Sequence, residues 1–162
     1  MKPKIPVSVL VVVHTTALEV LLMERAARPG YWQSVTGSLE RPDEPLESAA
    51  RREVLEETGI AAGAGMLDRW NLTYTFEIYA EWRARFAPGT THNTEHVFSL
   101  EVPEPVPVRL APLEHTASAW LPWDAAARRC FSWSNRDAIR ILAQQRGVPR
   151  ADAPCAALSF VP

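Results

Sequence analysis

The alternation of apolar and polar positions divides the chain into strands and helices joined by loops rich in proline and glycine. Val7–His14 is almost entirely apolar and β-branched, which predicts a central strand buried on both faces. A short turn separates it from Leu18–Arg25, and we expect these two segments to form a hairpin. Glycine, proline and serine dominate the next segment, which predicts a loop around the short extended stretch Trp32–Gly37.

Two later segments favour helices. The first runs from about Pro45 to Thr58, with a proline in its first turn and a glycine just past its end. The second is "SWSNRDAIRILAQQRG", in which we expect Ser134 to be the N-cap, Asp137 to complete a capping box and Gly147 to follow the end.

The region between the helices is mostly extended in its pattern. Asn71–Phe86 is β-like, a turn-rich connector follows over Ala87–Glu95, and His96–Val102 is another expected strand. Pro103–Pro112 is interrupted by prolines and predicts an edge or a loop. Strands interleaved with two helices indicate the α/β or α+β class with a mixed sheet.

Length and composition favour a single globular domain. The 162 residues suffice for one core, so we assign residues 1–145 to the domain and 146–162 to a C-terminal tail. A net charge of −2 gives no basic surface for nucleic acid, and no apolar run approaches the roughly 18–20 residues that span a membrane. Cys130 and Cys155 lack metal-ligand spacing. From the charge, the apolar runs and the cysteines together, we expect a cytoplasmic protein without nucleic-acid or membrane partners. The oligomeric state stays open.

Three glutamates in the first predicted helix violate the rules of helix stability. Because each residue turns about 100°, Glu53, Glu56 and Glu57 share one face. Glu53 and Glu57 are a like-charge i,i+4 pair in the half of the helix where the macrodipole disfavours negative charge. A solvated acidic face is the usual interpretation of a charge run, but violations of this kind are expected at functional sites. Clustered carboxylates favour Mg²⁺ or Mn²⁺ over zinc, so we predict a metal site.

The loop before this helix supplies further candidates. Gly37 would allow a tight turn, and Glu44 lies at the helix entrance. Arg52 follows Glu44 by two helical turns, so a salt bridge between them would tie the loop to the helix and orient the metal ligands. Acids at a helix N-terminus are favoured in any case, so Glu44 and the neighbouring Asp43 would mean little alone.

Together these residues resemble the signature of the Nudix hydrolases, G-x5-E-x7-R-E-U-x-E-E-x-G-U, in which U is a bulky apolar residue. The matching positions are Gly37, Glu44, Arg52, Glu53, Val54, Glu56, Glu57, Gly59 and Ile60. Here six residues rather than five separate Gly37 from Glu44, and Asp43 is the alternative first acid.

The resemblance implies a Nudix fold, with a mixed β-sheet sandwiched between helices, and metal-dependent hydrolysis of a diphosphate-containing substrate. Glu53 and Glu57 would be the principal ligands, Glu56 a further or water-mediated one, and Arg52 an orienting residue. The chemistry needs a divalent cation because an anionic nucleophile is otherwise repelled by an anionic diphosphate.

Residues 4–142 also resemble, in order, the bacterial dihydroneopterin triphosphate pyrophosphohydrolases of folate biosynthesis, a branch of this family. The similarity includes "YWQSVTGS", "NTEHVFSLEVP", "EHTASAWL" and "SWSNRDAI". It implies Mg²⁺-dependent cleavage of dihydroneopterin triphosphate to the monophosphate and pyrophosphate, with Glu114 as an added metal ligand and a candidate general base. The implied substrate contacts are Lys4, Arg25, Thr36, Phe76, Glu77, Ile78, Tyr79 and Ser132.

Three other functions stay under consideration. A Nudix enzyme that cleaves purine nucleoside triphosphates would use the same metal chemistry, because pterin and guanine share a ring edge. A module that binds nucleotide without cleaving it is disfavoured by the presence of all the signature glutamates, and RNA-cap recognition by the lack of a basic stripe. Trp32 and Trp133 are assigned no ligand role, whereas His115 is of interest because it follows Glu114.

Overall fold

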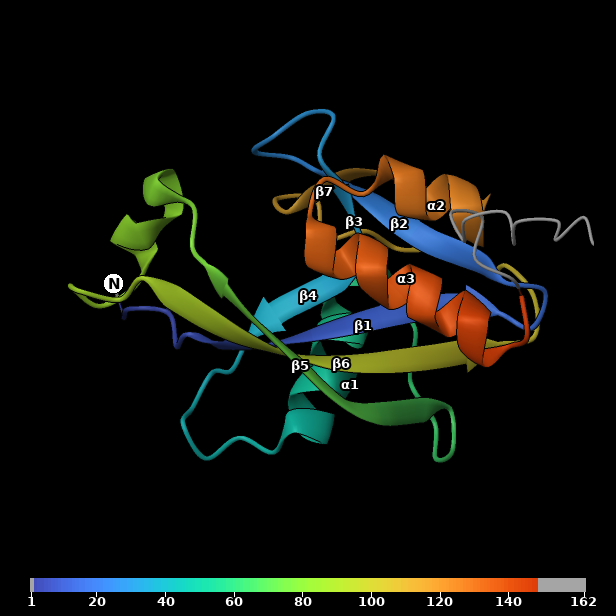
Figure 1. The fold of residues 1–162 in the computed structure, drawn as a ribbon, viewed down its shortest axis with the longest axis horizontal. Helices are drawn as coiled ribbons and strands as arrows, with labels where there is room; N and C mark the ends of the chain where they lie inside the picture. The colour runs from blue at the N-terminus through green and yellow to red at the C-terminus, as the bar shows by residue number, and fades with distance from the viewer. Residues whose placement is uncertain (1, 149–162) are drawn as a thin grey trace, which may run out of the picture.

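The computed structural model describes residues 2–148, which form a seven-stranded sheet with helices on both faces (Figure 1). The strand order is β3-β2-β1-β6-β5, with β4 added beside β1 and β7 beside β2. The strands are β1 (Val7–Thr15), β2 (Glu19–Arg25), β3 (Trp32–Gln33), β4 (Val35–Ser38), β5 (Leu67–Glu77), β6 (His92–Val102) and β7 (His115–Pro122). The helices are α1 (Leu46–Thr58), the 3₁₀ helix η1 (Ala80–Arg85), α2 (Trp123–Arg129) and α3 (Trp133–Gln145).

The central strand β1 is buried on both faces, as its apolar run predicts. Leu10 and Val12 belong to the core that contains α2 and α3, whereas Val9, Val11 and Val13 belong to the core that contains α1. Successive side chains of a strand point to opposite faces, so one continuous apolar segment serves both layers. The expected mixed sheet between helices is therefore confirmed, with β1 and β6 parallel and the other pairs antiparallel.

One edge of β1 is shared by two strands. The expected hairpin partner β2 pairs near the end of β1, where His14 lies opposite Val20. The first half of β1 instead pairs with β4, with Leu10 opposite Thr36 and Val9 opposite Gly37. Thr36 and Gly37 therefore present opposite faces of the sheet, Thr36 toward the α3 side and Gly37 toward the α1 side.

The expectation that all of Asn71–Phe86 is extended is wrong in its second half. The strand β5 ends at Glu77, and the chain then turns into η1, in which the Trp82 amide donates to the Tyr79 carbonyl at 2.9 Å. The Arg83 side chain stabilises this turn because its Nε donates to the Ile78 carbonyl, 3.0 Å away, and its guanidinium pairs with Glu77. A strand pattern in the sequence does not reveal such local side-chain anchors.

One further strand boundary differs from the expectations, and two further elements were not expected. Strand β6 begins at His92 rather than His96, so the second half of the expected connector is paired with β5. Strand β7 and helix α2 were not expected, and the described residues thus hold three α-helices rather than two. Pro103–Pro112 lies outside the strands and helices, in agreement with its prolines.

The N-cap of α3 is Ser132, not Ser134. The Ser132 hydroxyl accepts from the Asn135 amide at 3.3 Å. Ser134 and Asp137 instead make tertiary contacts, because Ser134 donates to Glu95 and Asp137 accepts from the Tyr74 hydroxyl. The two side chains of the expected capping box therefore form tertiary hydrogen bonds instead of capping the helix.

At the other end of α3, Gly147 has a φ of +80° and follows the helix as expected. Most of the tail assigned to 146–162, including Cys155, lies outside the described residues, and the buried Cys130 is a free thiol. Among residues 2–148, no helix is long and apolar enough to cross a membrane.

Candidate active site

Helix α1 brings the signature glutamates to the sheet but divides them by burial. It starts after Pro45 and ends at Gly59, whose φ of +76° is the left-handed conformation that favours glycine at a helix end. Glu53 and Glu57 are buried, with 8% and 2% of their surface exposed, whereas Glu56 faces solvent. The acidic face is thus mainly a buried face, which excludes its interpretation as a simple solvated surface.

Gly37 lies directly against the Glu53 carboxylate. A Cβ atom at position 37 would come within 2.0 Å of the Glu53 Cδ, a distance that no packed structure tolerates. Gly37 is within strand β4 and its φ is not in the left-handed region, so the expected tight turn is wrong. Glycine is needed here because a carboxylate occupies the space of its missing side chain.

Arg52 and Glu44 form the salt bridge that two-turn spacing predicts. The Arg52 Nε and Nη2 donate to the two carboxylate oxygens of Glu44 at 2.9 and 3.1 Å, and Arg52 Nη1 lies 2.6 Å from Glu53 Oε1. The Arg52 hydrogen bond holds the pKa of Glu44 below its usual value. Asp43, the alternative first acid, is exposed and pairs with Arg41 at 3.4 Å.

Glu44 also fastens the loop that connects β4 to α1. Its Oε2 accepts from the Glu40 backbone amide at 2.7 Å, and Arg52 Nη2 donates to the Ser38 carbonyl at 3.2 Å. These contacts join the end of β4, the loop and the helix, and they leave Glu53 held between Arg52 and Gly37. The geometry favours Glu44 over Asp43 as the acid that orients this network.

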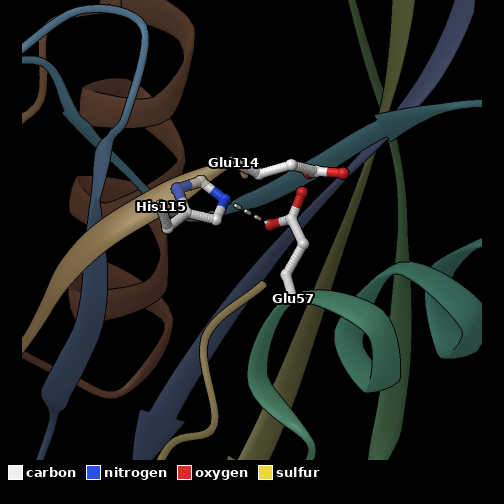
Figure 2. Close-up of side chains that lie close together, drawn as sticks. All are labelled: Glu57, Glu114 and His115. Carbon is white, nitrogen blue, oxygen red and sulfur yellow. Dashed lines mark ion pairs between the residues drawn. The ribbon is translucent and has the colours of Figure 1, made fainter. Parts of the chain in front are cut away.

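Glu114 and His115 reach the C-terminal end of α1 from the start of β7 (Figure 2). One ligand atom from each of Glu57, Glu114 and His115 lies within 4.8 Å of the others. His115 Nε2 is 3.3 Å from Glu57 Oε2, and both side chains are buried, while Glu114 is exposed. Figure 2 shows the Glu57 carboxylate between the imidazole and the Glu114 side chain.

A β-bulge explains why these residues meet. The register between β2 and β7 shifts at Glu24/Arg25, so that Arg25 pairs with His115, and the Ala26 amide donates to the Glu114 carbonyl at 2.8 Å. Bulges bend a strand and redirect its side chains, and they are frequent beside active sites. The bulge therefore places the cation of Arg25 next to the acids at the end of α1.

Burial makes the acids of this site reluctant to ionise without a cation. Burial raises the pKa of Glu53 to about 7, although its hydrogen bond with Arg52 opposes the rise. Burial also raises the pKa of Glu57, and here His115 opposes it. Repulsion from Glu57 and Glu56 raises the pKa of Glu53 further, so a bound divalent cation would stabilise the ionised forms.

A cavity of about 760 Å³ opens beside the acids, a volume typical of small-molecule sites. Glu57, Glu114 and His115 lie at its acidic end. A second, smaller cavity of about 370 Å³ contains Glu53 and Glu56 and shares Lys4, Thr36, Gly37, Ser38 and Glu114 with the first. The two hollows thus meet at β4, with Glu114 facing both.

All the side chains expected to contact substrate line the larger cavity, namely Lys4, Arg25, Thr36, Phe76, Glu77, Ile78, Tyr79 and Ser132. Burial lowers the pKa of Lys4, and the nearby Arg85 lowers it further, which indicates a cluster of positive charge. Arg25 donates to Gln33 at 3.1 Å and lies over the Trp82 ring. Cations near a group of acids suit an anionic ligand that also carries divalent metal.

The four positions of Phe76–Tyr79 differ in character. Phe76 is half-buried and Ile78 is buried, whereas Glu77 and Tyr79 are exposed. Across the cavity, Trp133 is 54% exposed and makes an edge-to-face contact with Tyr74 at 5.2 Å between centroids. Trp133 is thus a cavity-lining aromatic residue, a placement that its position in the sequence did not indicate. Trp32, in contrast, is buried in the core with α2 and α3.

Sequence reasoning missed two buried polar residues of the cavity, Asn93 and Glu95 of β6. They were assigned to a turn-rich connector because the strand was expected to begin at His96. The available signal was alternation, since Asn93, Glu95 and Val97 occupy every second position of the strand. Polar residues at inward positions hide a strand whose inner face lines a cavity rather than a core.

A comparison with known protein families decides the identity of the fold. The model of the NUDIX domain matches residues 4–142. The chain belongs to the NUDIX family.

Two named relatives are similar to this NUDIX protein over most of their length. The dihydroneopterin triphosphate diphosphatase of Escherichia coli (strain K12) is 43% identical over 145 residues, covering 86% of this chain and 95% of the relative. The enzyme of the same name from Haemophilus influenzae is 36% identical over 137 residues, covering 82% and 84%. The structure of the E. coli dihydroneopterin triphosphate pyrophosphohydrolase superposes with a TM-score of 0.83 at 40% identity, covering 90% of this chain and 99% of that chain.

Proposed function

We propose that this NUDIX protein hydrolyses dihydroneopterin triphosphate to dihydroneopterin monophosphate and pyrophosphate, with Mg²⁺ as its cofactor and Mn²⁺ as a substitute. The observation that carries the proposal is the 43% identity to the E. coli enzyme over 95% of that enzyme's length. The cavity supports it, because its acidic end and its aromatic walls suit a triphosphate joined to a flat ring. The expected cytoplasmic location is part of this proposal.

The acids of the site fit a divalent cation. The buried Glu57 Oε2 has His115 Nε2 3.3 Å away but no hydrogen bond of good geometry among the described residues, and the candidate ligands offer hard carboxylate oxygens. Glu53, Glu57 and Glu114 would hold the metal, with Glu56 as the exposed, more weakly engaged ligand. When bound, the metal would neutralise the diphosphate and favour attack by water.

The protein's own side chains would divide the remaining work. Arg52 would keep Glu53 in place through its contact at 2.6 Å, and His115 would do the same for Glu57. Lys4 and Arg25 would bind the phosphate oxygens and fix the triphosphate along β4. Glu114 is exposed and faces both cavities, which supports its proposed role as the base that would accept a proton from the attacking water.

A turnover assay tests the proposal. The purified protein is incubated with dihydroneopterin triphosphate and Mg²⁺, and pyrophosphate and orthophosphate are measured separately. We expect one pyrophosphate for each monophosphate formed, and loss of activity when EDTA removes the metal. Stepwise release of orthophosphate would contradict the proposed reaction.

The same assay separates the alternative enzyme. Guanine has the ring edge of a pterin, so dGTP and an oxidised purine nucleotide are measured beside dihydroneopterin triphosphate. We expect dihydroneopterin triphosphate to have the highest kcat/KM. A purine nucleotide that exceeds it by a wide margin would move the assignment to a purine nucleoside triphosphate pyrophosphohydrolase, with the same metal chemistry.

A further inference from the structure

The carboxylate of Glu95 is buried in the large cavity without a cation beside it. Glu95 is 6% exposed, and its Oε1 accepts from the Ser134 hydroxyl at 3.0 Å. The Thr36 hydroxyl lies 3.5 Å from its Oε2, and no ion pair of Glu95 is found among residues 2–148. A buried carboxylate accepts up to four hydrogen bonds, so two hydroxyls leave acceptor capacity unused.

Asn93 adds a second unused acceptor on the same face of β6. Its Nδ2 donates to Ser8 Oγ at 2.7 Å, and its Oδ1 is buried without a partner in the described part of the chain. Asn93 is 6% exposed and lines the same cavity. Because residues two apart on a strand share a face, the Asn93 amide oxygen and the Glu95 carboxylate line the cavity together.

An aromatic residue flanks this pair of acceptors. Phe76 of β5 lies directly opposite Asn93 of β6, and residues opposite each other on paired strands share a face. Trp133, adjacent to Ser134 in α3, lines the same cavity. The part of the cavity lined by β5, β6 and the start of α3 thus combines acceptors with aromatic walls, the requirements of a flat ring that carries N–H groups.

We propose that Glu95 and Asn93 determine ring specificity by accepting hydrogen bonds from the ring N–H and the exocyclic amine of a 2-amino-4-oxopyrimidine ring. The inference rests on the proposed function, since it takes the ring of a ring-bearing triphosphate to occupy this cavity. A carboxylate matches the two adjacent donors of this edge, and the Asn93 Oδ1 receives the remaining amine hydrogen. The mutual fit uses the spare acceptor capacity of Glu95 and pairs Asn93 Oδ1, which is otherwise buried without a partner in the described part of the chain.

The pair also explains which rings are rejected. Adenine offers an acceptor where guanine and pterin offer a ring N–H, so its lone pair would face the Glu95 carboxylate. A hypoxanthine ring keeps the ring N–H but lacks the 2-amino group, and it would leave Asn93 Oδ1 unpaired. Sites built around such polar groups discriminate strongly against a ring that lacks the matching donor.

The experiment compares the wild type, Glu95→Gln and the matched control Glu101→Gln, an acid on the same strand that pairs with Arg146 outside the cavity. Steady-state kinetics are measured with dihydroneopterin triphosphate. We expect Glu95→Gln to raise KM about 10–100-fold with kcat within about three-fold, since the ring lies away from the reacting phosphorus. Glu101→Gln should match the wild type. Circular dichroism confirms that each variant folds.

A second readout isolates the 2-amino group. dGTP and dITP differ only in that group, so their ratio of kcat/KM, or of Ki against the main substrate, reports its recognition. The wild type should prefer dGTP about 10-fold or more, and Asn93→Ala and Glu95→Gln should reduce the preference to about two-fold. Variants that keep both the wild-type KM and the wild-type preference would overturn the inference.

The outcomes also separate this inference from the proposed function. A wild type that cleaves dihydroneopterin triphosphate, with variants that behave as the wild type, upholds the function and overturns the ring assignment. A wild type that cleaves only purine triphosphates overturns the substrate proposal, while the dGTP and dITP comparison still decides the role of Glu95. A wild type that cleaves dGTP and dITP with equal kcat/KM overturns the ring assignment directly.

Discussion

Glu53 and Glu95 are two buried glutamates with the same acidity in different surroundings. Each is less than one-tenth exposed, and burial raises the pKa of each to about 7. Glu53 has the Arg52 guanidinium at 2.6 Å and further acids beside it, whereas the partners of Glu95 within residues 2–148 are the hydroxyls of Ser134 and Thr36. The burial of a carboxylate therefore does not reveal its ligand, and its neighbours do.

The neighbours indicate different ligands at the two places. Clustered acids that outnumber the cations beside them favour additional positive charge, which a metal supplies. A carboxylate surrounded by hydroxyls favours further neutral N–H donors, which a heteroaromatic ring supplies. Two consecutive residues of β4 separate the two environments, because Thr36 contacts Glu95 and Gly37 contacts Glu53 from the opposite face.

The largest loss of activity is expected from Glu57→Gln, which removes a proposed metal ligand and nearly preserves the shape of the side chain. Loss of one negative ligand removes about 4 kcal/mol of transition-state stabilisation, or about 10³-fold in kcat. Turnover at saturating Mg²⁺ and the thermal unfolding midpoint are measured together, and the midpoint should stay close to the wild type. Full activity at saturating Mg²⁺ would remove Glu57 from the metal site.

Gly37→Ala should disturb the proposed metal site through its packing against Glu53. The added Cβ would meet the Glu53 carboxylate, so this carboxylate must leave its place beside Arg52 or the backbone must shift. We expect a loss of about 1–3 kcal/mol in the free energy of unfolding and about 10²-fold in kcat/KM. The control is Gly63→Ala, where the nearest atom to a Cβ is Met66 Sδ at 3.4 Å, and it should change neither quantity. Equal behaviour of the two variants would refute the packing argument.

Glu44→Gln tests the network that orients Glu53. The variant loses the charge that pairs with Arg52, and we expect Mn²⁺ affinity or kcat/KM to fall about 10–100-fold, as for other residues that position metal ligands. Asp43→Asn is the matched control, since Asp43 is exposed, and its effect should stay within about two-fold. The reverse order of effects would make Asp43 the first acid of the signature.

The pH dependence of the unfolding free energy sharpens the contrast between Glu53 and Glu95 without a measurement of turnover. The folded pKa of Glu95 is about 7, above its ordinary value of 4.5, so its protonated form favours the folded state. That contribution is complete below about pH 4.5 and is lost as the pH rises through about 7. Relative to Glu95→Gln, the wild type should lose on the order of 3 kcal/mol of unfolding free energy between pH 4.5 and 8. Urea titrations of both proteins measure this, and a pH-independent difference would contradict it.

Regular local patterns were sufficient to predict the parts of the site that depend on them. The apolar run of β1 and the course of α1 follow from residue spacing along one element, and the salt bridge between Glu44 and Arg52 follows from spacing across the start of α1. The resemblance in sequence then named a set of side chains that the fold gathers around one cavity. Their individual roles stay predictions, tested by the variants above.

Tertiary contacts decided the rest, and no local pattern encodes them. Ser132 and Ser134 both precede a polar residue by three positions, and only the contact between Ser134 and Glu95 explains why Ser132 is the cap. The start of β6 escaped detection because Asn93 and Glu95 point into a cavity and therefore look like loop residues. The meeting of β7 with α1 depends on a bulge between strands that are about ninety residues apart in sequence.

The contact between Gly37 and the Glu53 carboxylate has a consequence for how the signature should be searched. Position 37 must lie close to a side chain of α1, and Glu44 must reach Arg52. Neither condition fixes the number of residues between Gly37 and Glu44. The connecting loop can therefore gain or lose a residue, as it has here, while both contacts persist. A search for related chains should allow a variable gap before the helix and no gap within it, because helical register tolerates no insertion.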